Sequence, residues 1–309
     1  MVFLNRHYLI VFKVFQRFIG GDGIKVGYEC GPCFLRQARE AAELSTDDDE
    51  LRFEIIQDVL RFIGGRFDEN LSSNATGSLI HQHVKRKTGC MDPYLDEKRK
   101  GNRLAISLLP KLRDILKEDN SLETYVKIAI VGNILDFGTF ELGTDFESMI
   151  LEGLDKELMI NHLDELENAL EKYDEVLYLV DNTGEIVFDK LLLEKIREYG
   201  VDITVAVKEK PIINDACMED AVEAGLDDVA RLITTGSDSV GVVESMVSDE
   251  FLQYFRNSPF VISKGMGNFE GITEMDLEGQ DIFVLLCTKC PAISKYLNID
   301  QGSHILKKL

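Results

Sequence analysis

The chain has 309 residues, the length of two ordinary domains or of one large one. It carries 34 Lys and Arg against 55 Asp and Glu, so its formal net charge is −21. A surface this acidic repels phosphate backbones, which argues against nucleic acid or an anionic membrane as the main partner. It also makes any group of lysines at one place more conspicuous.

The first 23 residues differ from the rest in composition. They contain four basic residues and no acid before Asp22. Their apolar centre, 8–12, is too short for a secretory signal, and nowhere does the chain reach the roughly 18 apolar residues that span a bilayer. We interpret residues 1–23 as a basic, apolar extension or a mis-set translation start, and we expect a cytoplasmic protein. The sequence predicts no oligomeric state.

The region 24–170 has the periodicity of helices. Apolar residues recur every three to four positions, and Ser45-Thr46-Asp47 and Gly64-Gly65 are typical of a helix start and a helix end. We expect this region to form a helical cap. The predicted helices cover 30–44, 51–63, 78–87, 104–116 and 122–130, followed by an acidic helix over 155–173.

The pattern changes to short apolar runs in the region 171–309. Each run ends in a polar turn, and several turns lead into a helix, as in 191–199, 216–224 and near Val240. Continuously apolar strands alternating with helices indicate a parallel sheet covered on both faces. We therefore predict an α/β protein with a doubly wound, mainly parallel sheet in three layers and an N-terminal helical cap. The predicted strands are 175–180, 202–207, 229–233, 260–262 and 281–286.

Polar residues stand at the predicted carboxyl ends of these strands, where ligands bind in open parallel sheets. Asp181, Asn182 and Asp215 offer only oxygen ligands, which suit Mg²⁺ or Mn²⁺. The competing interpretation is that Asp-Asn makes a turn and that Asp215 caps a helix.

Candidate phosphate ligands follow other strands. The loop Thr235-Gly236-Ser237 offers backbone N–H groups and hydroxyls, and Lys264, Asn268 and Lys289 stand at later strand ends. Loop formation or solvent exposure would explain each one separately. Several strand-end lysines in so acidic a chain favour an anion site.

Six cysteines include two CxxC pairs, Cys30/Cys33 and Cys287/Cys290. They could form a four-thiolate zinc site if the fold brought the pairs together, or they could be buried, reduced thiols. Neither a P-loop nor a dinucleotide-binding glycine motif occurs. His81 and His83 stand two apart and would point to different helix faces, which argues against a histidine metal site there.

Taken together, the motifs resemble the damage-control phosphatases, formerly catalogued as domain of unknown function 89, in the stand-alone archaeal and bacterial branch with CxxC. The resemblance extends from about residue 25 to the end of the chain. It implies metal-dependent hydrolysis of phosphate monoesters of small, damaged or surplus metabolites such as sugar phosphates. The motifs are Tyr28-Glu-Cys-Gly-Pro-Cys33, Gly132-Asn-Ile-Leu-Asp-Phe137, Asp181-Asn-Thr-Gly-Glu185, Ile213-Asn-Asp-Ala216, Thr235-Gly-Ser237, Ser263-Lys-Gly-Met-Gly-Asn-Phe-Glu270 and Lys289-Cys-Pro291.

The resemblance also implies roles. It implies a divalent metal, Mn²⁺, Mg²⁺, Ni²⁺ or Co²⁺, held by Asp181, Asn182 and Asp215, and catalytic roles for Asp181, Asp136 and Lys264. It implies that a small phosphorylated metabolite is bound by Asn133, Glu185, Thr235, Gly236, Ser237, Asn268 and Lys289.

We expect Lys264 and Lys289 to grip the phosphate while water attacks phosphorus; attack by Asp181 through an aspartyl-phosphate is the alternative. Two other functions remain open. One is an S-adenosylmethionine-dependent carboxyl methyltransferase, and the other is a non-enzymatic CxxC metal or redox module.

Overall fold

A computed structural model describes residues 23–24, 26–134, 145–277 and 279–309, apart from the side chains of Ile134 and Glu147. Its centre is a seven-stranded sheet with strand order β1-β7-β6-β5-β2-β3-β4. All neighbouring strands are parallel except β6 and β7. The strands are β1 (Leu158–Asn161), β2 (Glu175–Leu179), β3 (Asp202–Val207), β4 (Arg231–Thr234), β5 (Phe260–Lys264), β6 (Asp281–Cys287) and β7 (His304–Lys308).

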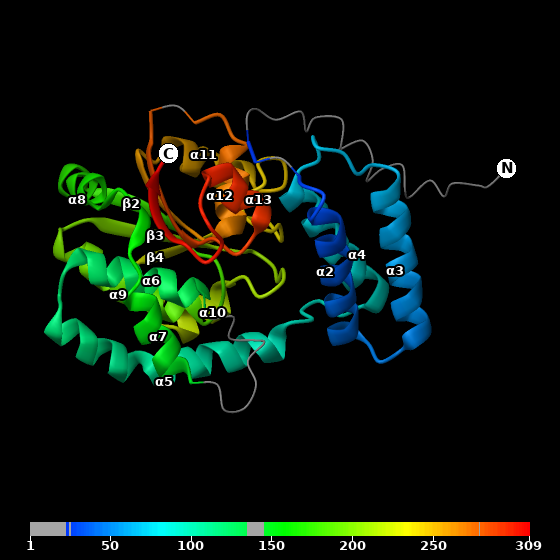
Figure 1. Ribbon diagram of the computed structural model, residues 1–309, viewed down its shortest axis with the longest axis horizontal. Coiled ribbons are helices and arrows are strands. Elements are labelled where there is room, and N and C mark those ends of the chain that lie inside the picture. The colour runs from blue at the N-terminus through cyan, green and yellow to red at the C-terminus, as the bar shows by residue number, and fades with distance from the viewer. Residues whose placement is uncertain (1–22, 25, 135–144, 278) are drawn as a thin grey trace.

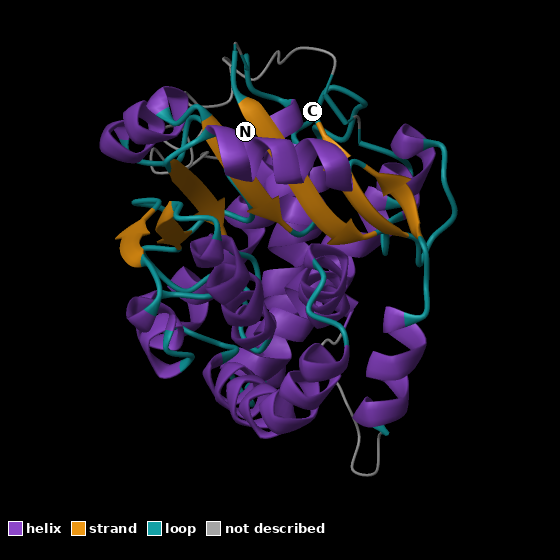
Figure 2. Cartoon of the chain, turned by 90° about the vertical axis from the view of Figure 1, so that its left-hand side faces the viewer, coloured by secondary structure: helices purple, strands orange, loops and turns teal. Residues whose placement is uncertain are grey.

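The two faces of the sheet are covered by different helices. Val176 and Tyr178 of β2 point into the same apolar core as α6 and α9, whereas Leu177 and Leu179 pack on the opposite face with Phe251. Helices therefore lie on both sides of the strands, as Figures 1 and 2 show, and the predicted three-layer α/β fold is confirmed. On one face are α5 (Leu95–Glu118), α6 (Leu122–Ile134), α7 (Phe146–Leu154), α8 (Leu163–Lys172), α9 (Glu185–Glu198) and α10 (Met218–Glu223); on the other are α11 (Asp249–Asn257), α12 (Met266–Thr273) and α13 (Pro291–Leu297).

The first three helices of the described chain form a separate bundle beside the sheet, at the right of Figure 1. They are α2 (Cys30–Ser45), α3 (Asp49–Gly64) and α4 (Ser73–Thr88). Phe34 and Ala38 of α2 share a core with Val59 of α3 and Ile80 of α4. Asp48 caps α3 by accepting from two backbone N–H groups, so this helix starts slightly earlier than its pattern predicts.

Helix α4 joins the bundle to the loops at the carboxyl ends of the strands. Asn74 donates to the carbonyl of Gly267 at 2.7 Å, and Lys85 donates to the carbonyl of Pro211 and to Asp238, each at 2.7 Å. Both side chains are buried, which makes these contacts strong. The bundle is thereby fixed against the strand-end loops.

Three local expectations are wrong. The acidic segment 155–173 is not one helix, because its first part forms β1 and only 163–172 is helical. No helix starts near Val240; the next one, α11, begins at Asp249. Strand β7 was not anticipated. Within 24–170, helices α5 and α6 pack on the sheet against α9 and not with the bundle. The division into a cap and an α/β domain at residue 170 stays a prediction.

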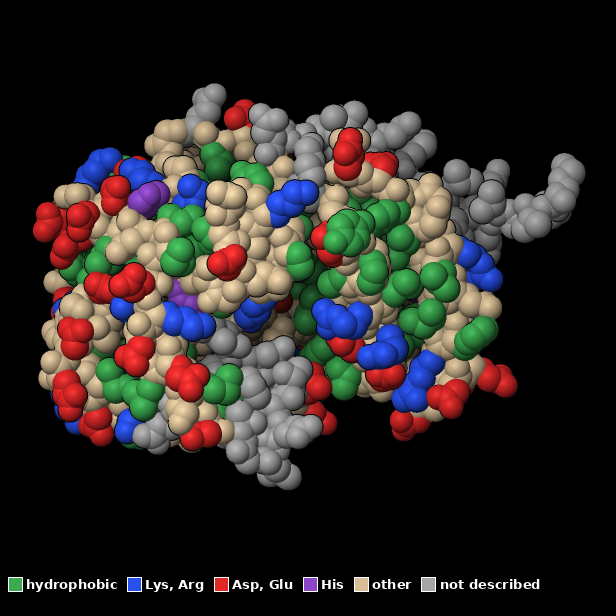
Figure 3. Space-filling model, viewed as in Figure 1, with side chains coloured by type: hydrophobic (Ala, Val, Ile, Leu, Met, Phe, Trp, Pro, Cys, Tyr) green, Lys and Arg blue, Asp and Glu red, His purple; other side chains and the backbone are tan. Residues whose placement is uncertain are grey.

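Among the described residues, none of the helices is both long enough and apolar enough to cross a membrane. Figure 3 shows acidic and basic side chains interspersed over the face in view. Of the predicted extension at residues 1–23, residues 1–22 lie outside the described residues.

Candidate active site at the strand ends

Asp181 and Asp215 are brought together by the backbone. The chain leaves β2 through Val180, and the carbonyl of Asp181 accepts from the N–H of Ala216 at 2.9 Å. Thr183 in turn donates its N–H to the carbonyl of Asn214, and an isolated antiparallel bridge pairs Asn182 with Asp215. The three predicted metal ligands therefore lie at one place, where β2 and β3 end.

Both carboxylates are buried without a full complement of positive charge. Burial, Glu185 and Asp215 raise the pKa of Asp181 well above its usual range. Burial also raises the pKa of Asp215 to about 6, although Lys208 opposes the shift from 3.5 Å away. Among the described residues, Asp215 Oδ2 accepts no hydrogen bond. The positive charge around these two carboxylates therefore does not balance their negative charge.

Asn133 reaches this site from the end of α6. Its Nδ2 donates to Asp181 Oδ2 at 3.2 Å and to Glu185 Oε2 at 2.9 Å, and its Oδ1 accepts from the N–H of Cys287. Asn182 Nδ2 donates to the same two carboxylates, at 2.9 and 3.4 Å. Two amides therefore hold Asp181 and Glu185 side by side. Asp136, the other residue predicted on this segment, lies outside the described residues.

Lys264 is fully buried and fully engaged. Its ammonium donates to the carbonyl of Ala129 at 2.9 Å, to Asp189 Oδ1 at 2.6 Å and to Glu185 Oε1. Burial alone would lower the pKa of Lys264, but Asp189 and Glu185 raise it above its ordinary value. An ammonium has three donors, and all three are used here. Direct binding of phosphate by Lys264 stays a prediction, and the geometry shows this lysine orienting Glu185.

Two residues of the segment after β5 support Asp181. Gly265 has φ +79°, and a Cβ placed on it would lie 1.8 Å from Asp181 Oδ2, so only glycine fits there. Asn268 is buried and donates to the carbonyls of Val180 and Lys264, each at 2.9 Å. Asn268 thereby fastens the end of β2 to the end of β5.

The remaining predicted phosphate ligands lie farther out. Lys289 is exposed at the end of β6, and its charge lowers the pKa of Asp181 against the larger effect of burial. Thr235 is buried and its hydroxyl finds no hydrogen-bond partner within the described ranges, while Ser237 Oγ accepts from the N–H of Ser239. Gly236 packs against Ser248. Among the described residues, no hydrogen bond or ion pair joins this loop to Asp181 or Asp215.

Asn102 was not anticipated. This fully buried residue of α5 accepts from the N–H of Gly184 at 2.7 Å and donates to Glu223 at 3.1 Å. It therefore fixes the turn between Asp181 and α9. The sequence carries no signal for it, since one asparagine within an amphipathic helix looks like any other surface residue.

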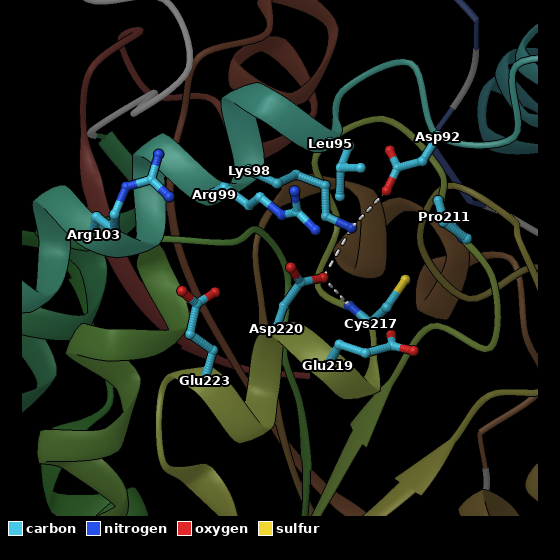
Figure 4. A pocket seen from close by; sticks show the side chains of 10 residues that line it. All are labelled: Asp92, Leu95, Lys98, Arg99, Arg103, Pro211, Cys217, Glu219, Asp220 and Glu223. Carbon is cyan, nitrogen blue, oxygen red and sulfur yellow. Dashed lines mark hydrogen bonds and ion pairs between the residues drawn. The ribbon is translucent and has the colours of Figure 1, made fainter.

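A cavity of about 680 Å³ lies between α5 and α10, next to the loop that carries Asp215. Figure 4 shows Lys98 between Asp92 and Asp220, while Arg99 and Arg103 lie along the same wall. Lys98 is buried and its ammonium is 2.8 Å from Asp220. None of the predicted metal or phosphate ligands lines this cavity.

The residues at the strand ends suit a hard divalent cation. Within the described ranges no three His, Cys, Asp or Glu side chains already form a metal cluster. However, Asp215 Oδ2, the buried Asp181 and the amide of Asn182 make a donor set of oxygens only, which is what Mg²⁺ and Mn²⁺ prefer.

The chain matches a family model over residues 26–305, the damage-control phosphatase ARMT1-like domain. It belongs to the damage-control phosphatase family. A family member from Methanocaldococcus jannaschii, named only as an uncharacterised protein, is 37% identical over 93% of this chain and 97% of its own length. A Pyrococcus horikoshii member named damage-control phosphatase is 36% identical over 91% and 97%.

The fold agrees with that of the family. The crystal structure of a DUF89 family protein from Pyrococcus horikoshii superposes with a TM-score of 0.83 at 35% identity, covering 92% of this chain and 99% of that one. A damage-control phosphatase of Archaeoglobus fulgidus is 28% identical over 92% and 99%. The resemblance inferred from the motifs is confirmed.

Proposed function

We propose that this protein is a divalent-metal-dependent phosphatase acting on phosphate monoesters of small metabolites such as sugar phosphates. The observation that carries the proposal is the pair of buried carboxylates, Asp181 and Asp215, at the ends of β2 and β3. Two buried like charges side by side are unfavourable without a cation. The names of the Pyrococcus and Archaeoglobus relatives support phosphatase activity.

Asp181, Asn182 and Asp215 would hold the metal, with Mn²⁺, Mg²⁺, Ni²⁺ or Co²⁺ as candidates. A divalent ion bound there would polarise the phosphoryl group and offset the charge that develops during transfer. Lys289 is exposed at the end of β6, and its charge acts on Asp181. It would draw the phosphate dianion of the substrate into an otherwise acidic molecule.

We infer that water rather than Asp181 attacks phosphorus, because Asp181 Oδ2 already accepts from Asn133 and Asn182. The new bond joins phosphorus to the water oxygen, and the bond from phosphorus to the ester oxygen breaks. One proton of the water passes to a carboxylate, for which Asp136 and Asp215 are the candidates, and the released ester oxygen takes a proton from solvent. Either route places the label of ¹⁸O-water in phosphate, so trapping of the enzyme during turnover is the deciding measurement, and a phosphorylated Asp181 would contradict attack by water.

A methyltransferase remains the alternative, which the ARMT1-like family description keeps open. The glycines after β5 would be its nucleotide-binding candidates. Gly265, however, is already explained by its closeness to the Asp181 carboxylate. This contact favours the phosphatase.

The test is phosphate release from sugar phosphates and p-nitrophenyl phosphate with each of the four metals, against EDTA and against methyl transfer from S-adenosylmethionine. Asp181→Asn should lower turnover by about a thousandfold or more. Asp202→Asn is the matched control, since Asp202 is exposed at the opposite end of β3. Inactivity with every metal, or full activity of Asp181→Asn, would overturn the proposal.

A further inference from the structure

Three of the six cysteines lie near the start of α2 and the start of α13. Cys30 begins α2 and is buried, Cys33 follows one turn later and is partly exposed, and Cys290 caps the start of α13. The segment just before α2 lies against α13, because a Cβ placed on Gly27 would lie 3.9 Å from Ala292 Cβ.

The fourth member of the CxxC pairs lies elsewhere. Cys287 packs in the core shared with α6 and α9, on the opposite face of the sheet from the apolar cluster that Cys290 contacts. The two pairs therefore do not assemble into the four-thiolate zinc site considered from the sequence. What remains at α2 is a pair of thiols, with a third nearby.

Two side chains direct N–H donors at the Cys33 sulfur. Gln37 Nε2 lies 3.2 Å from Cys33 Sγ, and Arg36 Nη2 lies 3.7 Å from it. Gln37 and Arg36 stand one turn further along α2, so the helix itself places both donors. A sulfur that accepts two N–H hydrogen bonds is held in one orientation, and the same donors would offset negative charge on it during an attack.

The orientation of the Gln37 amide is set by His81 of α4. Gln37 Oε1 and His81 Nε2 are 3.2 Å apart, and since an amide oxygen only accepts, the imidazole N–H must point at it. His81 is buried, and burial together with Lys85 lowers its pKa to about 4, so it is neutral. With its oxygen held by His81, Gln37 can present only its NH₂ group to Cys33.

We propose that Cys33 is a reactive thiol that undergoes thiol–disulfide exchange with a small-molecule or protein disulfide, with Cys30 as the resolving thiol. In the first step the Cys33 thiolate attacks one sulfur of the incoming disulfide; a bond between Cys33 and that sulfur forms, and the other half leaves as a thiolate. Cys30 then loses its proton to solvent and attacks Cys33 Sγ, which releases the second half. The protein dithiol is oxidised by two electrons, and the incoming disulfide is reduced to two thiols.

The positions of the two cysteines explain why Cys33 attacks first and Cys30 resolves the mixed disulfide. Burial raises the pKa of Cys30 to about 11, which keeps this thiol protonated and slow to attack from solution. Cys30 and Cys33 are three apart on one helix, so their side chains share a face, and bridging them needs only a local tightening of the first turn. Pro32 between them lacks an N–H, so tightening there breaks no hydrogen bond of its own.

Alkylation of the folded protein at pH 7 with iodoacetamide, followed by peptide mass spectrometry, tests the first role. Cys90 serves as the internal control, because it is also partly exposed. We expect Cys33 to react about tenfold faster than Cys90. Gln37→Met should lower this ratio severalfold, whereas Gln57→Met on α3 should leave it unchanged. Equal rates for Cys33 and Cys90 in the unaltered protein would overturn the proposal.

Glutathione disulfide tests the second role. The unaltered protein should form a Cys30–Cys33 disulfide, and Cys30→Ser should stop at a mixed disulfide on Cys33 that dithiothreitol reverses. Cys33→Ser should form neither. A disulfide that joins Cys290 to either residue, or a mixed disulfide of Cys30→Ser on another cysteine, would contradict the assignment. Both readouts are independent of phosphatase activity.

Discussion

At the end of the sheet, the Asp181 carboxylate occupies the space that a side chain at Gly265 would need. The 1.8 Å between Asp181 Oδ2 and a Cβ built on Gly265 is about half a normal contact distance, so no other residue can stand at 265 while Asp181 keeps its place. The glycine after β5 is therefore part of what positions the candidate metal ligand after β2.

We expect Gly265→Ala to displace Asp181 and to lower phosphatase turnover at least a hundredfold. Gly279→Ala is a matched control: φ is +73° there, close to the value at Gly265, but a Cβ would meet nothing within 4 Å. Positive φ costs both variants stability, and Gly265→Ala should lose more, because the ψ of 166° at this position is open almost only to glycine. Only Gly265→Ala should lose activity in assays of phosphate release, and equal activities would refute the displacement.

Replacing Asp215 should stabilise the metal-free protein in a pH-dependent manner. Burial raises the pKa of this carboxyl to about 6, so the folded state bears an unfavourable charge above that pH and is protonated below it. The penalty grows from the ordinary pKa of 3.8 up to the folded pKa. In EDTA, Asp215→Asn should therefore raise the melting temperature by a few degrees at pH 8 and by about half as much at pH 5. Phosphate release should be abolished. A variant less stable at pH 8 would argue against the charge deficit.

Removing Lys264 should destabilise the protein rather than only inactivate it. Lys264→Met leaves Glu185 and Asp189 buried without their cation, at a cost of about 3–5 kcal/mol in urea unfolding. Adding Asp189→Asn should recover part of the loss, since Asp189 is then neutral. If Lys264→Met keeps its stability and loses only activity, direct phosphate binding by Lys264 becomes the better explanation.

His304 should make the protein acid-sensitive. It is buried in β7, and neither ring nitrogen has a hydrogen-bond partner in the part of the chain that the structure describes. Burial, with Lys156 and Lys127, lowers its pKa to about 4. Between about pH 6.5 and pH 4 the unfolded chain binds a proton that the folded one does not, so stability falls as pH falls, by up to about 3 kcal/mol.

The check is urea unfolding at pH 7 and pH 4.5. His304→Leu should lose less stability than the unaltered protein between these two pH values, because leucine fills the site and binds no proton. The same loss in both proteins would show that other groups, such as His81, carry the effect.

The strand-end argument located much of the candidate site because parallel strands end at one edge. Asp181, Asn182 and Asp215 follow two strands whose apolar runs are unmistakable, and the structure places them together. Lys264 shows where this reasoning stops. A lysine after a strand looks like a phosphate ligand, and nothing local reveals that Glu185 and Asp189, one turn apart on α9, already hold it.

Other features depend on contacts distant in sequence. Residues 155–173 have the amphipathic pattern of a helix, but Leu158 to Asn161 pair with β7 instead, a contact almost 150 residues away. Asn102 and His81 are likewise ordinary polar residues until their partners, Gly184 and Gln37, are brought to them. Tertiary packing decides such positions, and periodicity does not record it.

The place of β7 has a consequence for how the chain acquires its structure. β7 is the last strand in sequence, yet it lies between β1 and β6. During synthesis β1 leaves the ribosome long before β7 and has no other strand to pair with among the described residues. The backbone N–H and C=O groups of β1 therefore stay without a strand partner until β7 is synthesised. The side of the sheet that carries β1 is therefore completed late, while β2, β3 and β5, which hold the candidate site, can pair earlier.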